Sequence, residues 1–496
     1  MPEYNVLSEP WIPVRMLTGE EKEVGILELL ENAHLMQCVS DPSPLFEYGI
    51  YRLLTVFLMD AFRPEIQADI EDMLAAGAFD MERIFAYIRE CEKEGPCFDL
   101  FDAKRPFLQS AYDEKWDKTI KPVALLLHNI PSGNNHIHFL HGYEGRQTFC
   151  PSVCVKALCT VNVFCTAGLQ GPSSVNGAPP IYVMIRGENL FEGLLLNCIP
   201  STMTQLKYGY PVWRYGTEVE PGKRMSEISL LEGMTLMARR CHLIPDENGG
   251  VCTYSGERSP VVVSKMHFQK GLNFEGYDSW RDPHVAYSIS DKGRSSIKPQ
   301  LGKEMWRNIG SIFGDDQKSP DVVRQYVDLL GARMPMIPVV TYGLMTNQAQ
   351  YESWSRDEVS LDMDIVKNSS RMWIIGICIE HTENVARELR RSLRTISHKA
   401  GEDIVEQSLG QFFARSRQEF FSELCRNVAR VDIKDNDAVN GVIEQWNKAL
   451  KNYAMEEFDA CADRLGLDGK DLMGRMKAQI SLLKGLAKLL GKEEKK

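Results

Sequence analysis

The sequence predicts an α+β fold, in which a large irregular N-terminal domain with long loops is followed by a C-terminal four-helix bundle. Two observations predict this class. Up to about residue 370, short β-rich runs alternate with apolar helical stretches and with breaks rich in glycine and proline. From about residue 380 onward, only helical periodicity is present. The predicted domains are therefore 1–370, an α+β domain, and 371–496, a four-helix bundle.

The N-terminal region contains elements of both kinds. Residues 45–62 are predicted to form an apolar helix, and the predicted strands are 123–127, 181–185 and 261–263. Breaks at 131–135, 168–172 and 177–180 separate such elements. Long loops inside a compact domain are often functional, so these breaks are candidate binding segments.

The C-terminal region is predicted to contain four helices, at about 382–398, 403–429, 438–465 and 472–490. Large apolar residues recur at helical spacing, for example Phe412, Phe413 and Phe420 in the second helix. The connections are short, which predicts that consecutive helices pack antiparallel.

Composition limits the class of protein. The chain has 496 residues, of which 44% are hydrophobic and 25% are charged, and this excludes a disordered or fibrous protein. The net charge of -11 makes it a poor non-specific nucleic-acid binder, because the whole molecule repels phosphate. Local basic patches could still contact DNA.

The sequence indicates a soluble cytoplasmic protein with no membrane partner. The longest apolar stretches, such as Trp373–Ile379, are far shorter than the ~20 residues of a membrane helix. The first residues lack the basic and apolar regions of a signal peptide. Thirteen cysteines, an odd number, are typical of reduced thiols in a large chain.

Four of the ten histidines lie in one segment, as His128, His136, His138 and His141. Neutral imidazoles at this density could bind a metal ion, since His136 and His138 would share one face of an extended strand. A polar loop whose imidazoles bond to backbone or to a ligand is the alternative, because no carboxylate stands beside them at a ligand spacing.

Two pairs of cysteines could form a structural zinc site. Cys150 and Cys154 are a close pair, and Cys241 and Cys252 are a wider one. Four thiolates can close a tetrahedral site that holds two loops together. Neither spacing is the tight CxxC of a zinc knuckle, and buried cysteine is often only a small apolar residue.

Glycines and arginines form two further candidate sites. Gly168, Gly171 and Gly177 lie in one loop with no Gly-Lys-Ser/Thr after it, which excludes a P-loop. They could allow backbone to approach a nucleic-acid groove, or they could simply form turns.

Arg387, Arg391 and Arg394 have i, i+4, i+7 spacing on one helix, with Arg390 beside them and Glu388 as the single acid among them. This basic stripe is either a phosphate contact or a solvated face.

No catalytic motif is present. The sequence lacks a GxSxG elbow, HExxH, a Walker A sequence and a GxGxxG after a strand. We therefore do not expect an enzyme.

Taken together, several segments resemble the CasA family, the large subunit of the type I-E CRISPR surveillance complex Cascade. The resemblance rests on Tyr4–Arg15, Pro180–Gly187, Trp280–His284 and Gly343–Ala349, and on the C-terminal helices. These segments occur in the family's order over nearly the whole chain.

The resemblance implies a DNA-recognition subunit without catalysis and with no required cofactor. The family reads the protospacer-adjacent motif (PAM) of duplex DNA from the minor groove, helps to open the duplex, and recruits a helicase–nuclease. Guided complexes leave the remaining sequence reading to RNA pairing. The implied partners are the other Cascade subunits, CRISPR RNA, double-stranded target DNA and the helicase–nuclease.

The resemblance also implies roles for individual residues. The family's glycine-rich loop against the PAM corresponds to the loop with Gly168 and Gly171. Its minor-groove lysine corresponds to Lys270, with Lys265 as the nearby alternative. Its glutamine wedge corresponds to Gln348. An ammonium group suits a groove that offers mainly acceptors.

A second loop and the zinc site follow from the same resemblance. The family's loop near the RNA 5′ end corresponds to 134–141, where Asn135 and Phe139 are the candidate contacts. The family's zinc site uses two close cysteine pairs, and Ser255 stands where one cysteine is expected. Either Cys241 supplies the fourth thiolate of a structural zinc site, or the site is lost.

Two other functions remain open on the sequence. The histidine segment 128–141 could serve a metal-dependent hydrolase or nuclease. The chain could also be a scaffold subunit that joins the assembly without contacting DNA.

Overall fold

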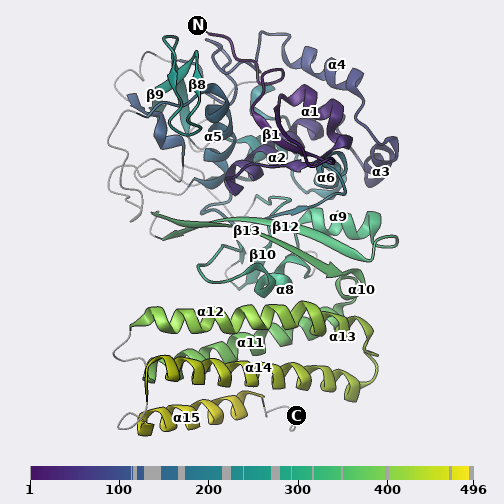
Figure 1. The fold of residues 1–496 in the computed structure, drawn as a ribbon. Coiled ribbons are helices and arrows are strands. Elements are labelled where there is room, and N and C mark those ends of the chain that lie inside the picture. Colours follow the sequence, from purple (N-terminus) through teal and green to yellow (C-terminus); the bar gives the residue numbers. More distant parts are fainter. Residues whose placement is uncertain are drawn as a thin grey trace. The chain divides into compact units, whose positions relative to one another are not determined.

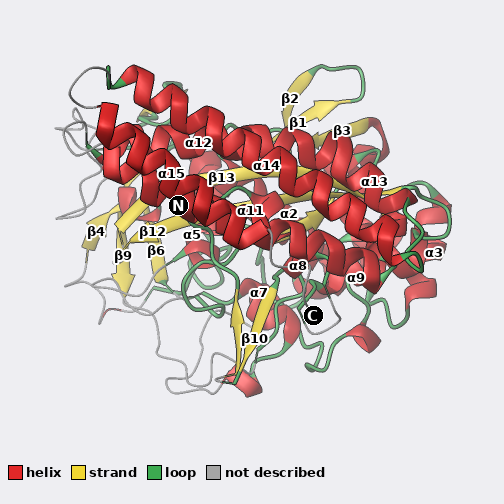
Figure 2. Ribbon diagram, turned by 90° about the horizontal axis from the view of Figure 1, so that it is seen from below, coloured by secondary structure: helices red, strands yellow, loops and turns green. Residues whose placement is uncertain are grey.

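The computed structural model describes residues 2–112, 114, 120–127, 147–165, 174–214, 225–237, 239–269, 280–291, 293–314, 318–347, 350–396, 401–467 and 472–490. The chain forms two compact units. The first comprises 1–301, 315–332 and 338–359, and the second comprises 302–314, 333–337 and 360–496. Helices and strands are mixed, as predicted (Figures 1 and 2).

The α-helices are α1 Ile26–Asn32, α2 Pro44–Phe62, α3 Gln67–Ala76, α4 Met81–Cys91, α5 Pro151–Phe164, α6 Leu190–Leu196, α7 Leu230–Thr235, α8 Ile309–Ile312, α9 Asp321–Leu330, α10 Met363–Val366, α11 Ser369–Ile396, α12 Glu402–Glu419, α13 Cys425–Arg430, α14 Asn436–Arg464 and α15 Leu472–Leu490. The strands are β1 Ile12–Met16, β2 Glu21–Val24, β3 Met36–Val39, β4 Ile120–Pro122, β5 Tyr182–Ile185, β6 Arg240–Asp246, β7 Gly250–Val251, β8 Arg258–Ser259, β9 Val262–Gln269, β10 Tyr287–Ser290, β11 Gly293–Ser296, β12 Met336–Asn347 and β13 Gln350–Asp362.

Helix α2 is the central helix of the first unit and confirms the helix predicted at 45–62. Ser43 caps its start by accepting a hydrogen bond from the Phe46 N–H, and Pro44 occupies the first turn, where no N–H is required. The helix ends where Arg63 adopts a left-handed backbone with φ 44°. Nearly all its side chains are buried, which explains the apolar sequence.

The first unit contains three small three-stranded sheets. Their strand orders are β2-β1-β3, β13-β12-β5 and β4-β9-β6, and β9 and β12 are each the central strand of their sheet. Strands β5 and β9 confirm the predictions at 181–185 and 261–263. The strand predicted at 123–127 is wrong, because Val123–Leu126 forms a 3-10 helix. A short apolar run can be buried as a strand or as a helical turn, and its periodicity does not distinguish them.

A single apolar cluster connects α2, α5, β5 and β12 in the core. Its members are Leu45, Tyr48, Val163, Phe164, Tyr182, Met184, Val285, Tyr287, Val340, Tyr342 and Leu344. The aromatic rings of Tyr48 and Tyr182 stack with centroids 4.4 Å apart. This packing fixes the strands β5 and β12 against the helix.

A buried polar network adjoins this cluster. Arg52 of α2 forms an ion pair of 2.9 Å with Asp282, and both side chains are almost fully buried. Asn176 donates to Asp282 at 2.8 Å. The Tyr48 hydroxyl accepts from Arg52 at 3.1 Å and lies 3.3 Å from His284 Nδ1. The network therefore ties the segment after residue 280 to the central helix.

The second unit consists mainly of long helices. Helix α11 packs against α12, α14 and α15, and Figures 1 and 2 show these helices running side by side. A short π-helical turn, Phe420–Leu424, separates α12 from α13. Trp306, from the preceding segment, is buried in this unit with its ring centroid 5.1 Å from that of Phe420.

Within the described residues, each of the four C-terminal segments predicted to be helical forms helix over nearly its whole length, and residues 397 and 398 lie outside that description. The first begins earlier than predicted, at Ser369 instead of about residue 382, and so includes the apolar stretch Trp373–Ile379. The domain limits 1–370 and 371–496 and the four-helix bundle layout stay predictions. Within the described residues, no helix is long and apolar enough to cross a membrane.

Candidate functional site

Most of the predicted nucleic-acid contacts lie outside the described residues, namely Asn135, Phe139, Gly168, Gly171, Lys270 and Gln348. The four histidines of the alternative metal site, His128, His136, His138 and His141, lie outside them as well. The roles of all these residues stay predictions.

Two of these positions follow directly on described strands. In the sequence, Lys270 comes immediately after the last residue of β9, and Gln348 comes immediately after the last residue of β12. Each of these strands is hydrogen-bonded on both sides within its sheet. The alternative lysine, Lys265, is exposed on β9 and pairs in register with Ile244 of β6.

The predicted arginine stripe is present on α11, and its side chains pair with carboxylates or, in the case of Arg387, with an amide. Arg387, Arg391 and Arg394 are all exposed. Arg391 pairs with Glu388 at 3.0 Å, and Arg394 Nε donates to Glu402 at 3.0 Å.

The neighbouring residues extend this pairing. Arg390 pairs with Glu406 at 2.9 Å, and Arg387 donates to the Asn384 side chain. Helix α12 thus supplies two acids, Glu402 and Glu406, that local sequence spacing does not reveal. Exposed ion pairs of this kind are weak and exchangeable, so a phosphate would have to compete with these carboxylates.

The four cysteines predicted to bind zinc form a thiol cluster, Cys150, Cys154, Cys241 and Cys252, and all four are buried. Cys150 precedes α5, Cys154 lies on α5, and Cys241 lies on β6. The thiols of Cys150 and Cys252 interact with each other, and this interaction lowers the pKa of Cys252 and raises that of Cys150.

After burial, the charges of Cys252 and Cys241 raise the pKa of Cys154, and the zinc site stays a prediction. Across the described residues, no three His, Cys, Asp or Glu side chains converge so as to hold a metal ion. Ser255 contributes a backbone N–H, which donates to the Cys252 sulfur at 3.5 Å, where the family is expected to have a further thiolate. None of the 13 cysteines forms a disulfide.

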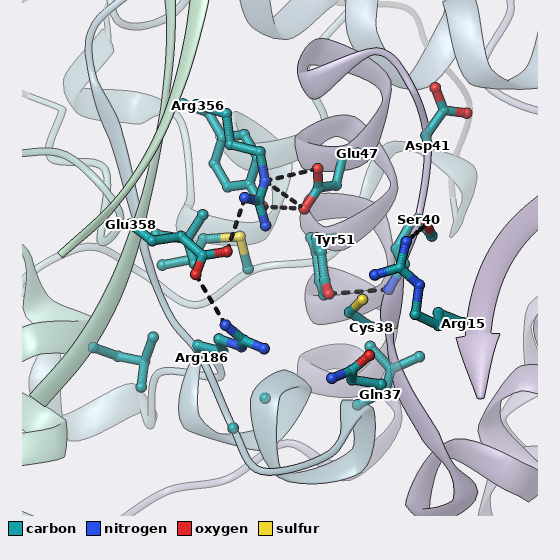
Figure 3. A pocket seen from close by; sticks show the side chains of 18 of the residues that line it. Arg15, Gln37, Cys38, Ser40, Asp41, Glu47, Tyr51, Arg186, Arg356 and Glu358 are labelled. Carbon is teal, nitrogen blue, oxygen red and sulfur yellow. Dashed lines mark hydrogen bonds and ion pairs between the residues drawn. The ribbon is translucent and has the colours of Figure 1, made fainter. Parts of the chain in front are cut away.

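A pocket of about 340 Å³ lies in the first unit between α2, β3, the end of β5 and β13 (Figure 3). Arg356 Nε donates to both carboxylate oxygens of Glu47, at 3.1 and 3.0 Å. Glu358 lies between two arginines, 2.8 Å from Arg356 and 2.9 Å from Arg186. Arg15, on the opposite wall, pairs with Glu21 at 2.8 Å.

The pocket is lined by acidic and basic side chains whose charges offset one another. Burial raises the pKa of Glu47, and the Tyr342 hydroxyl and Arg356 oppose that rise by hydrogen bonding to the carboxylate. Burial, followed by the charge of Glu47, raises the pKa of the Cys38 thiol. A thiol with a raised pKa is a poor nucleophile at neutral pH, so Cys38 is not an activated nucleophile.

The family of the chain follows from comparison with known proteins. A family model described as CRISPR-associated protein Cse1 matches residues 5–456. A curated CasA/Cse1 protein of Thermus thermophilus is 33% identical over 511 aligned positions, which cover 95% of this chain and 94% of that protein. The chain belongs to the CRISPR-associated protein Cse1 family.

Solved structures of Cse1 proteins share the fold. The structure of Thermobifida fusca Cse1 matches with a TM-score of 0.74 at 16% identity, covering 99% of this chain and 98% of that one. A chain from a structure titled CRISPR RNA-guided surveillance complex matches with a TM-score of 0.73 at 16% identity, covering 97% of this chain and all of that one.

Sequence reasoning identified the Cse1 family correctly but missed two features of this Cse1 chain. The pocket is built from segments more than 300 residues apart, so no local pattern indicates it. The pairing of Arg390 and Arg394 with α12 also depends on how the helices pack. The sequence feature that could have indicated this pairing is the presence of Glu402 and Glu406 near the start of the predicted second helix.

Proposed function

We propose that this chain is the DNA-recognition subunit of a CRISPR RNA-guided surveillance complex, which reads the PAM from the minor groove, helps to open the duplex and recruits a helicase–nuclease. The observation that carries the proposal is the Cse1 family match along nearly the whole chain. Its partners would be the other complex subunits, CRISPR RNA and double-stranded DNA.

Lys270 is proposed to enter the minor groove, and Gln348 to insert under the PAM. Support comes from their positions in the sequence, each directly after the last residue of the central strand of a sheet. Such strands are rigid supports, which a residue that must meet a base edge requires. The minor-groove pattern is degenerate, so a single ammonium group would accept more than one PAM.

Charge supports recognition within an assembly over binding by the isolated chain. The net charge is -11, and the exposed arginines of α11 pair with acids or an amide of the same chain. An acidic protein gains little from phosphate contact at physiological salt. We therefore expect DNA binding only when the chain is docked on the RNA-bearing complex.

The test is reconstitution of the purified chain with the RNA-bearing remainder of the complex. Binding is measured on duplexes that differ only in the PAM. Lys270→Ala should weaken PAM-dependent binding about tenfold, since a specific base contact contributes about 1–3 kcal/mol. Lys265→Ala, on β9, is the matched control, and an equal loss there would move the role to Lys265.

Strand opening is measured separately, with a fluorescent base analogue beside the PAM. Gln348→Ala should reduce opening more than binding, because unstacking a base step costs about a few kcal/mol that the wedge would offset. If neither the chain, the PAM nor the variants change binding, the proposal fails. Hydrolysis that requires a metal ion and is lost in His136→Ala plus His138→Ala would instead favour the enzyme, and assembly without PAM discrimination would favour the scaffold.

A further inference from the structure

Helix α15 has two apolar faces, and only one is buried. Ala478, Leu482 and Leu486 are buried in the second unit, where α15 packs against α11 and α14. The second face consists of Met473, Met476, Ile480 and Leu483, which are 65%, 50%, 48% and 38% exposed and which we call the α15 seam. No other described helix exposes more than one large apolar side chain.

Polar contacts fix the rotation of α15 and so keep the seam exposed. Arg475 pairs with Asp463 at 2.7 Å and with Asp459 at 3.2 Å, both on α14. Gln479 donates to Asp459 at 3.0 Å. On the side toward α11, Gly485 lies so close to Glu388 that a Cβ there would be 2.7 Å from its carboxylate oxygen. Turning the seam inward would break these contacts.

The spacing within the seam is that of a helix-pairing surface. Its residues are separated by three, four and three positions, the a and d pattern of a heptad. At about 100° per residue, the four side chains span about 80° of the helix surface. A stripe this narrow matches one partner helix better than a broad apolar surface.

Charge on α15 indicates the chemistry of the partner. Residues 472–490 contain four basic residues and no acid, although the whole chain has a net charge of -11. Lys477, Lys484 and Lys488 project within about 40° of one another along one edge of the seam, by the same helical geometry. In paired helices, charges beside the apolar seam select a partner of opposite sign.

We propose that the α15 seam binds an amphipathic helix of another polypeptide, with apolar residues at its a and d positions and carboxylates facing Lys477 and Lys484. A second copy of this chain would present lysines or a glutamine there instead of acids. The proposal goes beyond PAM recognition and does not depend on it, since this surface needs no DNA.

Binding is tested on the full chain with a fluorescent peptide of about four heptads, with leucine at a and d and glutamate at e and g. Mutual repulsion of the glutamates disfavours pairing of the peptide with itself. A second peptide with lysine at e and g is the charge control. We expect the glutamate peptide to bind at least about tenfold more tightly than the lysine peptide.

Variants of the chain make the test specific. Met476→Ser plus Ile480→Ser should weaken binding at least about tenfold, through loss of apolar burial. Leu17→Ser plus Leu301→Ser removes side chains that are 54% and 71% exposed elsewhere, and should change nothing. Lys477→Glu plus Lys484→Glu should reverse the preference between the peptides.

Three results would overturn the proposal: equal binding of both peptides, binding unaffected by the seam variants, or a dimer of the chain that the seam variants dissociate. Tighter binding of the seam to anionic vesicles or to duplex DNA than to the glutamate peptide would also overturn it, and would assign the lysines to a lipid or phosphate surface. Because the peptide assay contains no target DNA, its failure leaves the PAM proposal standing.

Discussion

The buried histidine of the polar network makes the first unit sensitive to mild acid. His284 Nε2 lies 3.3 Å from the Asn197 carbonyl, to which it can only donate. Its Nδ1 therefore accepts from the Tyr48 hydroxyl, which in turn accepts from Arg52. This arrangement favours a neutral imidazole, since a proton on Nδ1 would displace the hydrogen of the Tyr48 hydroxyl, which would then need another acceptor.

The size of the effect follows from the pKa of His284. Burial lowers that pKa from 6.5 to about 4; Asp282 opposes the shift and Arg52 adds to it. Between these two values, the unfolded chain binds a proton that the folded chain does not, so stability falls as the pH falls. From pH 7 to pH 5, the loss from this group is about 2 kcal/mol.

The assay is native-state hydrogen exchange at pH 7 and pH 5, corrected for intrinsic exchange rates. Peptides that cover 182–185 and 282–287 report the opening free energy of this region. In His284→Gln, whose amide can both donate and accept, we expect the pH dependence to shrink by about 2 kcal/mol. His381→Gln, in the second unit, is the control. A pH dependence that is unchanged in His284→Gln would refute the reasoning.

Three further predictions concern stability and metal content. Arg52→Met should destabilise the chain by about 3–5 kcal/mol by leaving Asp282 buried without its partner, and adding Asp282→Asn should restore part of the loss in thermal unfolding. In a urea titration, Gly187→Ala should lower the free energy of unfolding by about 1–3 kcal/mol, because the added Cβ would lie 2.3 Å from a backbone nitrogen of α6. Gly410→Ala on α12 is the control: a Cβ there would meet nothing within 4 Å, so this variant should be neutral or stabilising. Elemental analysis of the purified chain should find less than one zinc per chain, because Ser255 stands where the family is expected to have a thiolate. One zinc per chain that is lost on substituting the four cysteines would contradict this prediction.

The local sequence pattern predicted correctly those elements whose secondary structure depends mainly on their own residues. The apolar run at 45–62 and the helical spacing beyond residue 380 predicted α2 and the C-terminal helices, because burial of one helix face repeats every three to four residues. The same reasoning was wrong at 123–127, where Val123–Leu126 forms a 3-10 helix, since so short an apolar run shows no period. The family was identified from motifs spread over the whole chain.

The sequence by itself thus determined the family, the mixed fold and most of the long helices. Only the tertiary structure determines which charged side chains form ion pairs. The α11 arginines were read as a basic stripe, but packing of α12 brings Glu402 and Glu406 against it. Likewise, the Thr148 N–H donates to the Thr253 hydroxyl at 3.0 Å, which joins residues 105 positions apart. Such contacts depend on the path of the whole chain, which no local spacing records.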